Sequence, residues 1–166
     1  MARGRNRRND RDAPDGQLRG SNLAHAEINA LTALPPGDFG DHVLFSTLEP
    51  CFLCTAALRY SHVGTVRYAA PDPYWNGVER MAELNANIAQ RWTRRDGPLG
   101  GPLQGIAVLL HLVATLERGN GAVADAHEDA MPQVTRLARR LATAGVDQLR
   151  AMSLDEAIYA LRGDLT

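Results

Sequence analysis

Apolar positions along the first 70 residues fall into segments that alternate between helical and strand-like spacing. An apolar stripe predicts a helix over residues 23–34, and β-branched and aromatic runs predict buried strands over 43–47 and 64–70. Pro50 opens a second predicted helix over residues 51–60, because proline suits the first position of a helix. The order helix, strand, helix, strand indicates an α/β sandwich with parallel strand pairing.

Beyond residue 77 the pattern predicts mostly helices. A stretch rich in glycine and proline, residues 94–105, is expected to form an irregular loop. The expected helices cover residues 78–91, 106–118, 122–144 and 153–162. Pro132 lies inside the third of them, so we expect two helices or one kinked helix there. Ser153 and Glu156 have the spacing of a capping box at the start of the last helix.

Composition narrows the class of protein. The chain has 166 residues, enough for one domain with a core, and its 45% apolar and 22% charged residues are typical of a soluble globular protein. The formal net charge of -1 leaves a nucleic-acid partner possible but does not favour it. No apolar run approaches the roughly 20 residues that span a bilayer, and the N-terminus has no signal-peptide core. We therefore expect a cytoplasmic protein with no membrane partner.

Two cysteines carry the first chemical signal. Cys51 and Cys54 lie three positions apart at the start of a predicted helix, which places both sulfurs on one face of its first turn. Free N–H groups and the helix dipole lower thiol pKa values there. In a cytosolic chain this pair indicates metal or redox chemistry rather than a structural disulfide. Two thiolates would supply half of a tetrahedral zinc shell.

A His-x-Glu motif precedes the cysteines. His25 would add a third ligand and leave the fourth position to water, as in catalytic rather than structural zinc sites. Glu27 points away from His25 on an ideal helix, so we expect it to transfer protons rather than bind the metal. Each motif alone is weak evidence, but a redox dithiol would explain neither His25 nor Glu27.

The two motifs together resemble a known signature. His25-Ala26-Glu27 followed by Pro50-Cys51-Phe52-Leu53-Cys54 is similar to the pattern of the zinc-dependent cytidine/deoxycytidylate deaminase superfamily, in its nucleobase, nucleoside and tRNA adenosine deaminase branch. The resemblance covers residues 25 to about 72. It implies that a Zn²⁺ cofactor is bound by His25, Cys51 and Cys54, and that Glu27 is the proton shuttle. The implied substrate contacts are Asn6, in a Gly4-Arg5-Asn6-Arg7 segment like that of the family, with Ala26 and Pro50.

The resemblance also implies a fold, a three-layer α/β/α cytidine-deaminase-like sandwich with a mixed sheet. Members of the family place a helix and a β-hairpin before the first motif, whereas 24 residues precede His25 here. We therefore expect the N-terminal elements to be missing, through a misassigned start, which we favour, or through truncation. Residues 1–92 are expected to form the zinc-binding core, and 93–166 a helical C-terminal extension packed on the same domain. A homodimer is expected.

The implied function is hydrolytic deamination of a small-molecule nucleobase or nucleoside, in which zinc-bound hydroxide attacks the amidine carbon, Glu27 moves the proton and ammonia is released. Two alternatives stay open. One is a tRNA adenosine deaminase, which the net charge and the residues Ser21-Asn22-Leu23 before Ala-His disfavour. The other is a catalytically inactive, zinc-stabilised binding or assembly module.

Overall fold

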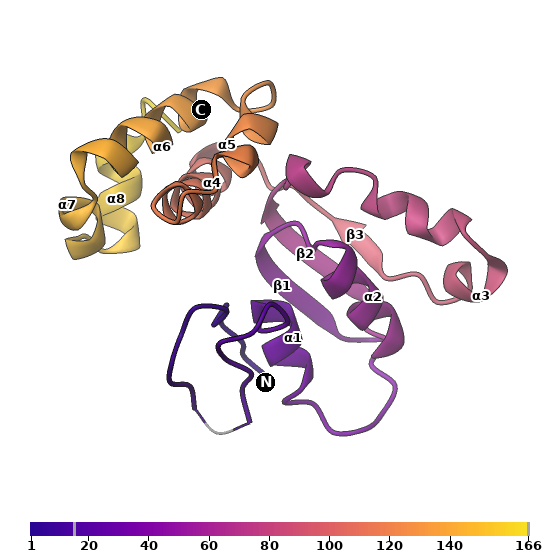
Figure 1. Cartoon of the computed structure of the whole chain (residues 1–166). Coiled ribbons are helices and arrows are strands. Elements are labelled where there is room, and N and C mark those ends of the chain that lie inside the picture. Colours follow the sequence, from indigo (N-terminus) through magenta and orange to yellow (C-terminus); the bar gives the residue numbers. More distant parts are fainter. Residues whose placement is uncertain (15, 166) are drawn as a thin grey trace. The chain divides into compact units, whose positions relative to one another are not determined.

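A computed structural model describes residues 1–14 and 16–165 of the chain. It contains a three-stranded sheet in the order β1 (Val43–Leu48), β2 (Thr65–Ala70), β3 (Arg94–Asp96), shown in Figure 1. Strands β2 and β3 run parallel, with Thr65 opposite Arg94. The sequence therefore predicted β1 and β2 correctly, to within one residue at each end.

Strand β1 is also parallel to β2. At the start of the pair the Thr65 N–H donates to the His42 carbonyl oxygen at 3.2 Å, and at the other end the Glu49 N–H donates to the Ala70 oxygen at 2.8 Å. Both strands therefore advance in the same direction, as a helical crossover requires. Because the three described strands are parallel, they do not confirm the expected mixed sheet, and the described structure supports an α/β fold in the coarser sense.

Each of the two predicted metal-binding motifs lies at the start of a helix. Helix α2 (Phe52–Tyr60) connects β1 to β2, and it agrees with the predicted helix over 51–60, although Pro50 lies just before it and Cys51 is its N-cap. Helix α1 (Ala26–Leu31) is shorter than the predicted 23–34. The chain makes a turn first, in which the His25 N–H bonds to the Leu23 oxygen at 2.8 Å, and His25 itself is extended.

The middle of the chain departs most from the sequence prediction. The expected helix over 78–91 is two short helices, η2 (Val78–Glu83) and α3 (Ala86–Ala89), because extended Asn85 caps the second by accepting the Ile88 N–H at 3.0 Å. A short helical turn, η1 (Pro73–Trp75), precedes them. The predicted loop over 94–105 was wrong at both ends, since it contains β3 and the start of α4 (Gly101–Leu116).

Four further helices follow. The expected helix over 122–144 is two helices, α5 (Gly121–His127) and α6 (Pro132–Ala144), and the second begins at Pro132. Ser153 and Glu156 form the predicted capping box of α8 (Leu154–Leu161). Helix α7 (Asp147–Ala151) was not predicted. None of the helices in the described part of the chain is long and apolar enough to cross a bilayer.

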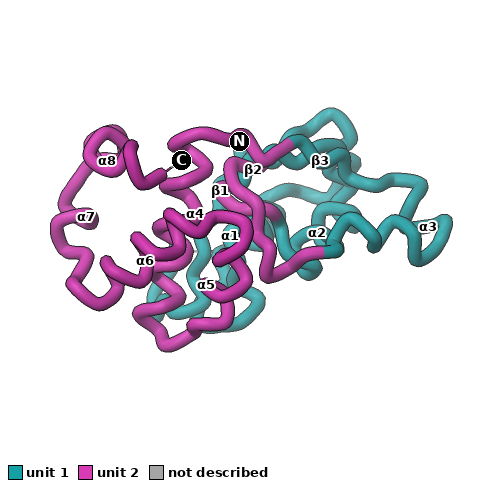
Figure 2. The backbone as a smooth tube through the Cα atoms, turned by 90° about the horizontal axis from the view of Figure 1, so that it is seen from above, with its two compact units in different colours: residues 1–46, 50–67, 77–96 teal, residues 47–49, 68–76, 97–166 magenta. Residues whose placement is uncertain are grey.

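The described residues form two compact units, coloured separately in Figure 2. Unit 1 comprises residues 1–46, 50–67 and 77–96, and unit 2 comprises 47–49, 68–76 and 97–166. The core of unit 1 contains Leu58, Val63 and Val66, with Leu31, Phe39 and Leu44 packed against them. The larger core of unit 2 is built mainly from the apolar faces of its helices, with Ala70 of β2 and two residues outside the helices, Val146 and Leu165. Its helical members are Ile106, Val108, Leu109, Leu112, Val113, Val123, Ala124, Val134, Leu137, Ala138 and Ala157.

Candidate metal centre and active site

The three predicted ligands meet in unit 1. His25 is the N-cap of α1, Cys51 is the N-cap of α2, and Cys54 lies in the first turn of α2. The Nδ1 atom of His25 lies 3.6 Å from Cys51 Sγ and 3.4 Å from Cys54 Sγ, and the three ligand atoms all fall within 4.8 Å of one another. Both cysteines are free and buried, and His25 is half-buried. The cluster is therefore assembled from the N-terminal ends of two helices.

The spacing of these atoms matches a zinc shell. Zinc binds thiolate sulfur at about 2.3 Å and imidazole nitrogen at about 2.0 Å, and at tetrahedral angles this places sulfur and nitrogen about 3.5 Å apart. The distances from His25 Nδ1 to the two sulfurs, 3.6 and 3.4 Å, agree with that value. The donor set of one imidazole and two thiols thus fits Zn²⁺ as its cofactor, with one coordination position left for a non-protein ligand.

The charges of the two thiols also favour a cation. A hydrogen bond from Cys54, with His25 nearby, lowers the pKa of Cys51 to about 4, so Cys51 is a thiolate at neutral pH. The same contact with Cys51 raises the pKa of Cys54, and burial and the nearby Glu27 carboxylate raise it further. The contact with Cys51 raises the pKa of His25 as well, although burial and the charge of Arg8 oppose this. A divalent cation would relieve the repulsion that keeps Cys54 protonated.

Glu27 lies beside the cluster without being required as a ligand. Its Oε2 atom accepts a hydrogen bond from Cys54 Sγ at 3.4 Å, and its Oε1 atom accepts one from the Ser46 hydroxyl at 3.0 Å. Ser46 reaches it because alternate residues of β1 point toward one face of the sheet. One carboxylate oxygen is thus held by β1, while the other contacts the predicted ligand Cys54.

The comparisons with known proteins agree with this geometry. Residues 1–70 match the family model described as "Cytidine and deoxycytidylate deaminase zinc-binding region". The first 70 residues of the chain are thus similar to the zinc-binding region of this deaminase superfamily. The match contains the neighbouring Glu27 and all three residues of the cluster, His25, Cys51 and Cys54.

Two curated relatives are similar to part of the chain. The "tRNA-specific adenosine deaminase subunit tad2" of Schizosaccharomyces pombe is 29% identical over 69 residues, which cover 39% of this chain and 18% of the relative. The "tRNA-specific adenosine deaminase" of Rickettsia felis is 31% identical over 71 residues, covering 40% of this chain and 49% of the relative. The matched part thus spans less than half the length of either relative. No solved structure matches the chain at a significant level.

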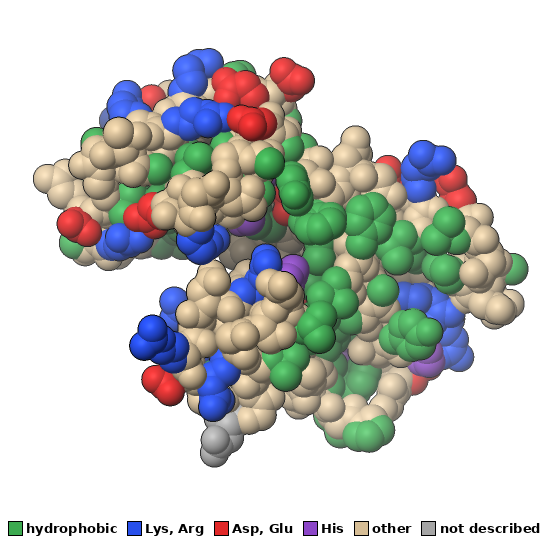
Figure 3. Space-filling view, in the orientation of Figure 1, with side chains coloured by type: hydrophobic (Ala, Val, Ile, Leu, Met, Phe, Trp, Pro, Cys, Tyr) green, Lys and Arg blue, Asp and Glu red, His purple; other side chains and the backbone are tan. Residues whose placement is uncertain are grey.

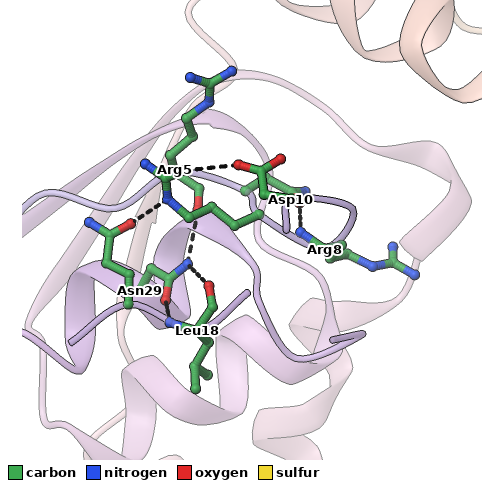
Figure 4. Close-up of polar contacts among 8 residues, drawn as sticks. Arg5, Arg8, Asp10, Leu18 and Asn29 are labelled. Carbon is green, nitrogen blue, oxygen red and sulfur yellow. Dashed lines mark hydrogen bonds and ion pairs between the residues drawn. The ribbon is translucent and has the colours of Figure 1, made fainter. Parts of the chain in front are cut away.

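The N-terminal segment of the deaminase region is anchored to α1 by one buried side chain. Asn29 is completely buried, and its amide nitrogen donates to the carbonyl oxygens of Arg5 and Leu18, each at 3.0 Å. Its amide oxygen accepts the Leu18 N–H at 2.7 Å, as Figure 4 shows. Gly4 lies against the same helix so closely that an added Cβ would overlap the Ala26 oxygen. Residues 4–5 and 18 are therefore fixed against the helix that begins at His25.

The predicted substrate contacts have different surroundings. Asn6 is exposed, and its side-chain oxygen accepts the Arg8 N–H at 3.2 Å. The next residue, Arg7, bonds through its N–H to the Ala24 oxygen at 2.9 Å, which brings this segment beside the start of α1. Ala26 is half-buried, whereas Pro50 is buried. Their contacts with a substrate remain predictions.

Sequence reasoning missed two residues that shape this centre, Ser46 and Asn29. Ser46 had a weak signal, since it is a polar residue in the middle of a strand predicted to be buried. Asn29 had a similar one, because it lies within an otherwise apolar helical stretch. A buried polar side chain requires partners, but nothing in the spacing named Arg5, Leu18 or Glu27 as those partners.

Proposed function

We propose that this chain is a zinc-dependent hydrolytic deaminase, a hydrolase that acts on the C–N bond of a cyclic amidine in a nucleobase or nucleoside. The observation that carries the proposal is the position of Glu27, whose carboxylate contacts Cys54 at 3.4 Å and is held by Ser46 at 3.0 Å. A proton acceptor thus lies next to a three-ligand metal cluster. The family match over residues 1–70 supports the same reaction class.

In this proposal His25, Cys51 and Cys54 hold the ion, which when bound supplies an activated water. Glu27 would carry one proton of the attacking water to the ring nitrogen, and would then carry the second, from the hydroxyl that this water leaves on the carbon, to the departing amine. The carbon exchanges its exocyclic nitrogen for oxygen, so one water is consumed and one ammonia is released. Ser46 is a positioning residue, because it orients the carboxylate through Oε1 and leaves Oε2 toward the metal position.

Replacing the carboxylate tests this role directly. We expect Glu27→Gln to keep one zinc per chain but to lower ammonia release by about 100-fold or more, the usual contribution of a general acid–base residue. The exposed Glu79 provides a matched control, and Glu79→Gln should release ammonia at the unchanged rate. Zinc content is measured by atomic absorption, and ammonia is measured over cytosine, cytidine, guanine and adenine. Undiminished turnover by Glu27→Gln would refute the role.

Deamination of adenosine in tRNA is the second candidate. The observation in its favour is that both curated relatives carry the name tRNA-specific adenosine deaminase. An anticodon-arm RNA assayed beside the four small substrates separates the two candidates, because only the tRNA enzyme would prefer the RNA. Full zinc occupancy with no ammonia from any of these substrates would instead favour the non-catalytic zinc module.

A further inference from the structure

Positive charge is concentrated in the N-terminal segment. Residues 1–22 contain six arginines against three aspartates, whereas the whole chain has a net charge of -1. Figure 3 shows basic side chains gathered over this segment, at the lower left of the view. The segment thus has the opposite sign from the rest of the protein. Such a local excess favours an anionic ligand even when the total charge does not.

The segment is held in place rather than attached only at one end. The Asn29 amide fixes Arg5 and Leu18 from α1, and the Arg7 N–H bonds to the Ala24 oxygen at 2.9 Å. Ala24 directly precedes the predicted zinc ligand His25. The backbone of Arg7 therefore lies beside the residue that precedes His25, and Arg8 follows it directly within unit 1.

Arg7 and Arg8 differ in how their charges are used. The side chain of Arg7 is 16% exposed and pairs with Asp10 at 2.9 Å, so its charge is neutralised locally. Arg8 is exposed, and its guanidinium donates to the neutral Asn22 oxygen at 2.9 Å. Within residues 1–14 and 16–165 no carboxylate pairs with Arg8. Figure 4 shows its side chain extending away from Asp10.

The bond to Asn22 also orients Arg8. Asn22 lies three residues before His25, so it holds the Arg8 guanidinium near the N-terminal end of α1. A guanidinium has five N–H donors in a planar fork that suits phosphate oxygens, and Asn22 occupies one of them. The remaining donors are available to a ligand that approaches the metal centre.

From these contacts we infer that the substrate carries a phosphate group and that Arg8 binds it. The inference rests on the proposed function and narrows its substrate class to nucleotides or phosphodiester-linked nucleosides, as opposed to free bases. The phosphate is the one anion that is covalently attached to such a substrate. Arg8 is then a specificity-determining residue, whereas Arg7, already paired with Asp10, has a structural role.

The test compares each nucleoside with its phosphorylated form. Zinc-loaded Glu27→Gln protein, in which turnover does not interfere, is titrated with cytidine, cytidine 5′-monophosphate, adenosine, adenosine 5′-monophosphate and an anticodon-arm RNA. We expect at least one phosphate-bearing probe to bind about tenfold or more tightly than its nucleoside, the scale of a hydrogen-bonded charge pair. The monophosphates and the RNA distinguish the two sources of phosphate.

Variants of two arginines then locate the contact. In the Glu27→Gln protein, the further substitution Arg8→Gln should abolish most of the preference for phosphate. Arg8→Lys should retain part of it, because lysine keeps the positive charge but lacks the planar set of N–H donors. Arg11 is exposed in the same segment, so Arg11→Gln makes an identical change in net charge and should preserve the preference.

Three outcomes would overturn the inference. They are equal affinity for nucleoside and phosphorylated forms, no binding of any phosphate-bearing probe, and an equal loss in Arg8→Gln and Arg11→Gln, which would mean that only total charge matters. Failure of the proposed function looks different. In that case the Arg8-dependent preference is measured, but wild-type protein releases no ammonia from any of the probes.

Discussion

The two units differ in what holds them together. Unit 1 has a small apolar core around Leu58, Val63 and Val66, and its N-terminal segment is fixed by polar contacts. In unit 2, α4, α5, α6 and α8 pack around a core with many more completely buried apolar side chains, such as Leu109 and Leu112. The unit with the proposed metal site thus depends on a few specific polar groups, and the other unit depends on apolar area.

This difference predicts how each unit responds to perturbation. Apolar packing is spread over many side chains, so its loss is graded and insensitive to ligands. Polar anchors and metal ligands are few, and each of them fixes several segments at once. Unit 1 should therefore respond to metal and to single polar substitutions, and unit 2 to changes of core volume and to protonation of its buried histidines.

Removal of the metal is the largest expected effect. Zinc binding contributes on the order of 10 kcal/mol to small metal-dependent folds. Without the ion, the Cys51 thiolate and the Glu27 carboxylate raise the pKa of buried Cys54. The negative charges of Cys51 and Glu27, between α1 and α2, are then not balanced by a metal cation. Hydrogen exchange after chelation should show large losses of protection in α1 and α2 with little change in α4 and α6. Equal losses in both units would break the comparison.

Loss of core volume should act on unit 2. Leu109 is completely buried in α4, so Leu109→Ala is expected to lower the free energy of unfolding by about 4 kcal/mol through lost burial and a residual cavity. The next residue, Leu110, is 46% exposed and provides the control, and Leu110→Ala should cost about 0.5 kcal/mol or less. Urea denaturation followed by circular dichroism measures both values. Similar costs for the two variants would contradict the packing of α4.

Unit 2 should also lose stability in acid through His111. Burial lowers the pKa of His111 to about 4 from its ordinary 6.5, with His127 and Arg118 adding to this effect. The unfolded chain therefore binds the proton more readily, so the stability contributed by neutral His111 is complete above pH 6.5 and is lost as the pH falls toward 4. The difference corresponds to about 3 kcal/mol.

The measurement is urea denaturation of unit 2 between pH 7.5 and 4. His111→Gln removes the titrating group, so its stability should fall less steeply over that range. Burial also lowers the pKa of His127, which leaves a residual slope of the same sign in the variant. Identical pH profiles for the wild type and His111→Gln would remove His111 as the cause.

The sequence was most informative where function demands particular atoms. The motifs predicted that His25, Cys51 and Cys54 lie together, and their ligand atoms do lie within 4.8 Å of one another. Such a prediction is possible because zinc constrains the type and position of its ligands strongly. The strands β1 and β2 and the helix α2 were also predicted closely, since periodicity and proline mark them. Strand β3 was not predicted, because its residues Arg94, Arg95 and Asp96 are all polar. They form a strand by pairing with β2, and no local sequence pattern reveals that pairing.

Polar anchors could not be predicted for a related reason. A side chain such as Asn29 is defined by its partners, and Arg5 and Leu18 lie 24 and 11 residues away along the chain. Sequence periodicity describes which face of a helix is apolar but not which buried amide meets which carbonyl. No pattern in the sequence therefore indicates that the N-terminal segment is fixed against α1, as it is in the structure.

Substitution of Asn29 tests whether this anchor matters, with the smallest expected effect of the four. Asn29→Ala would leave the Leu18 N–H and the carbonyl oxygens of Arg5 and Leu18 without their partner. We expect this to lower the free energy of unfolding of unit 1 by about 2 kcal/mol. Hydrogen exchange of the Leu18 amide reports the bond directly, because Asn29 is its acceptor at 2.7 Å. The exposed Asn9 of the same segment is the control, and Asn9→Ala should leave that amide protected. If Leu18 remained protected in Asn29→Ala, unit 1 would be held by something other than its polar contacts, and the contrast with unit 2 would fail.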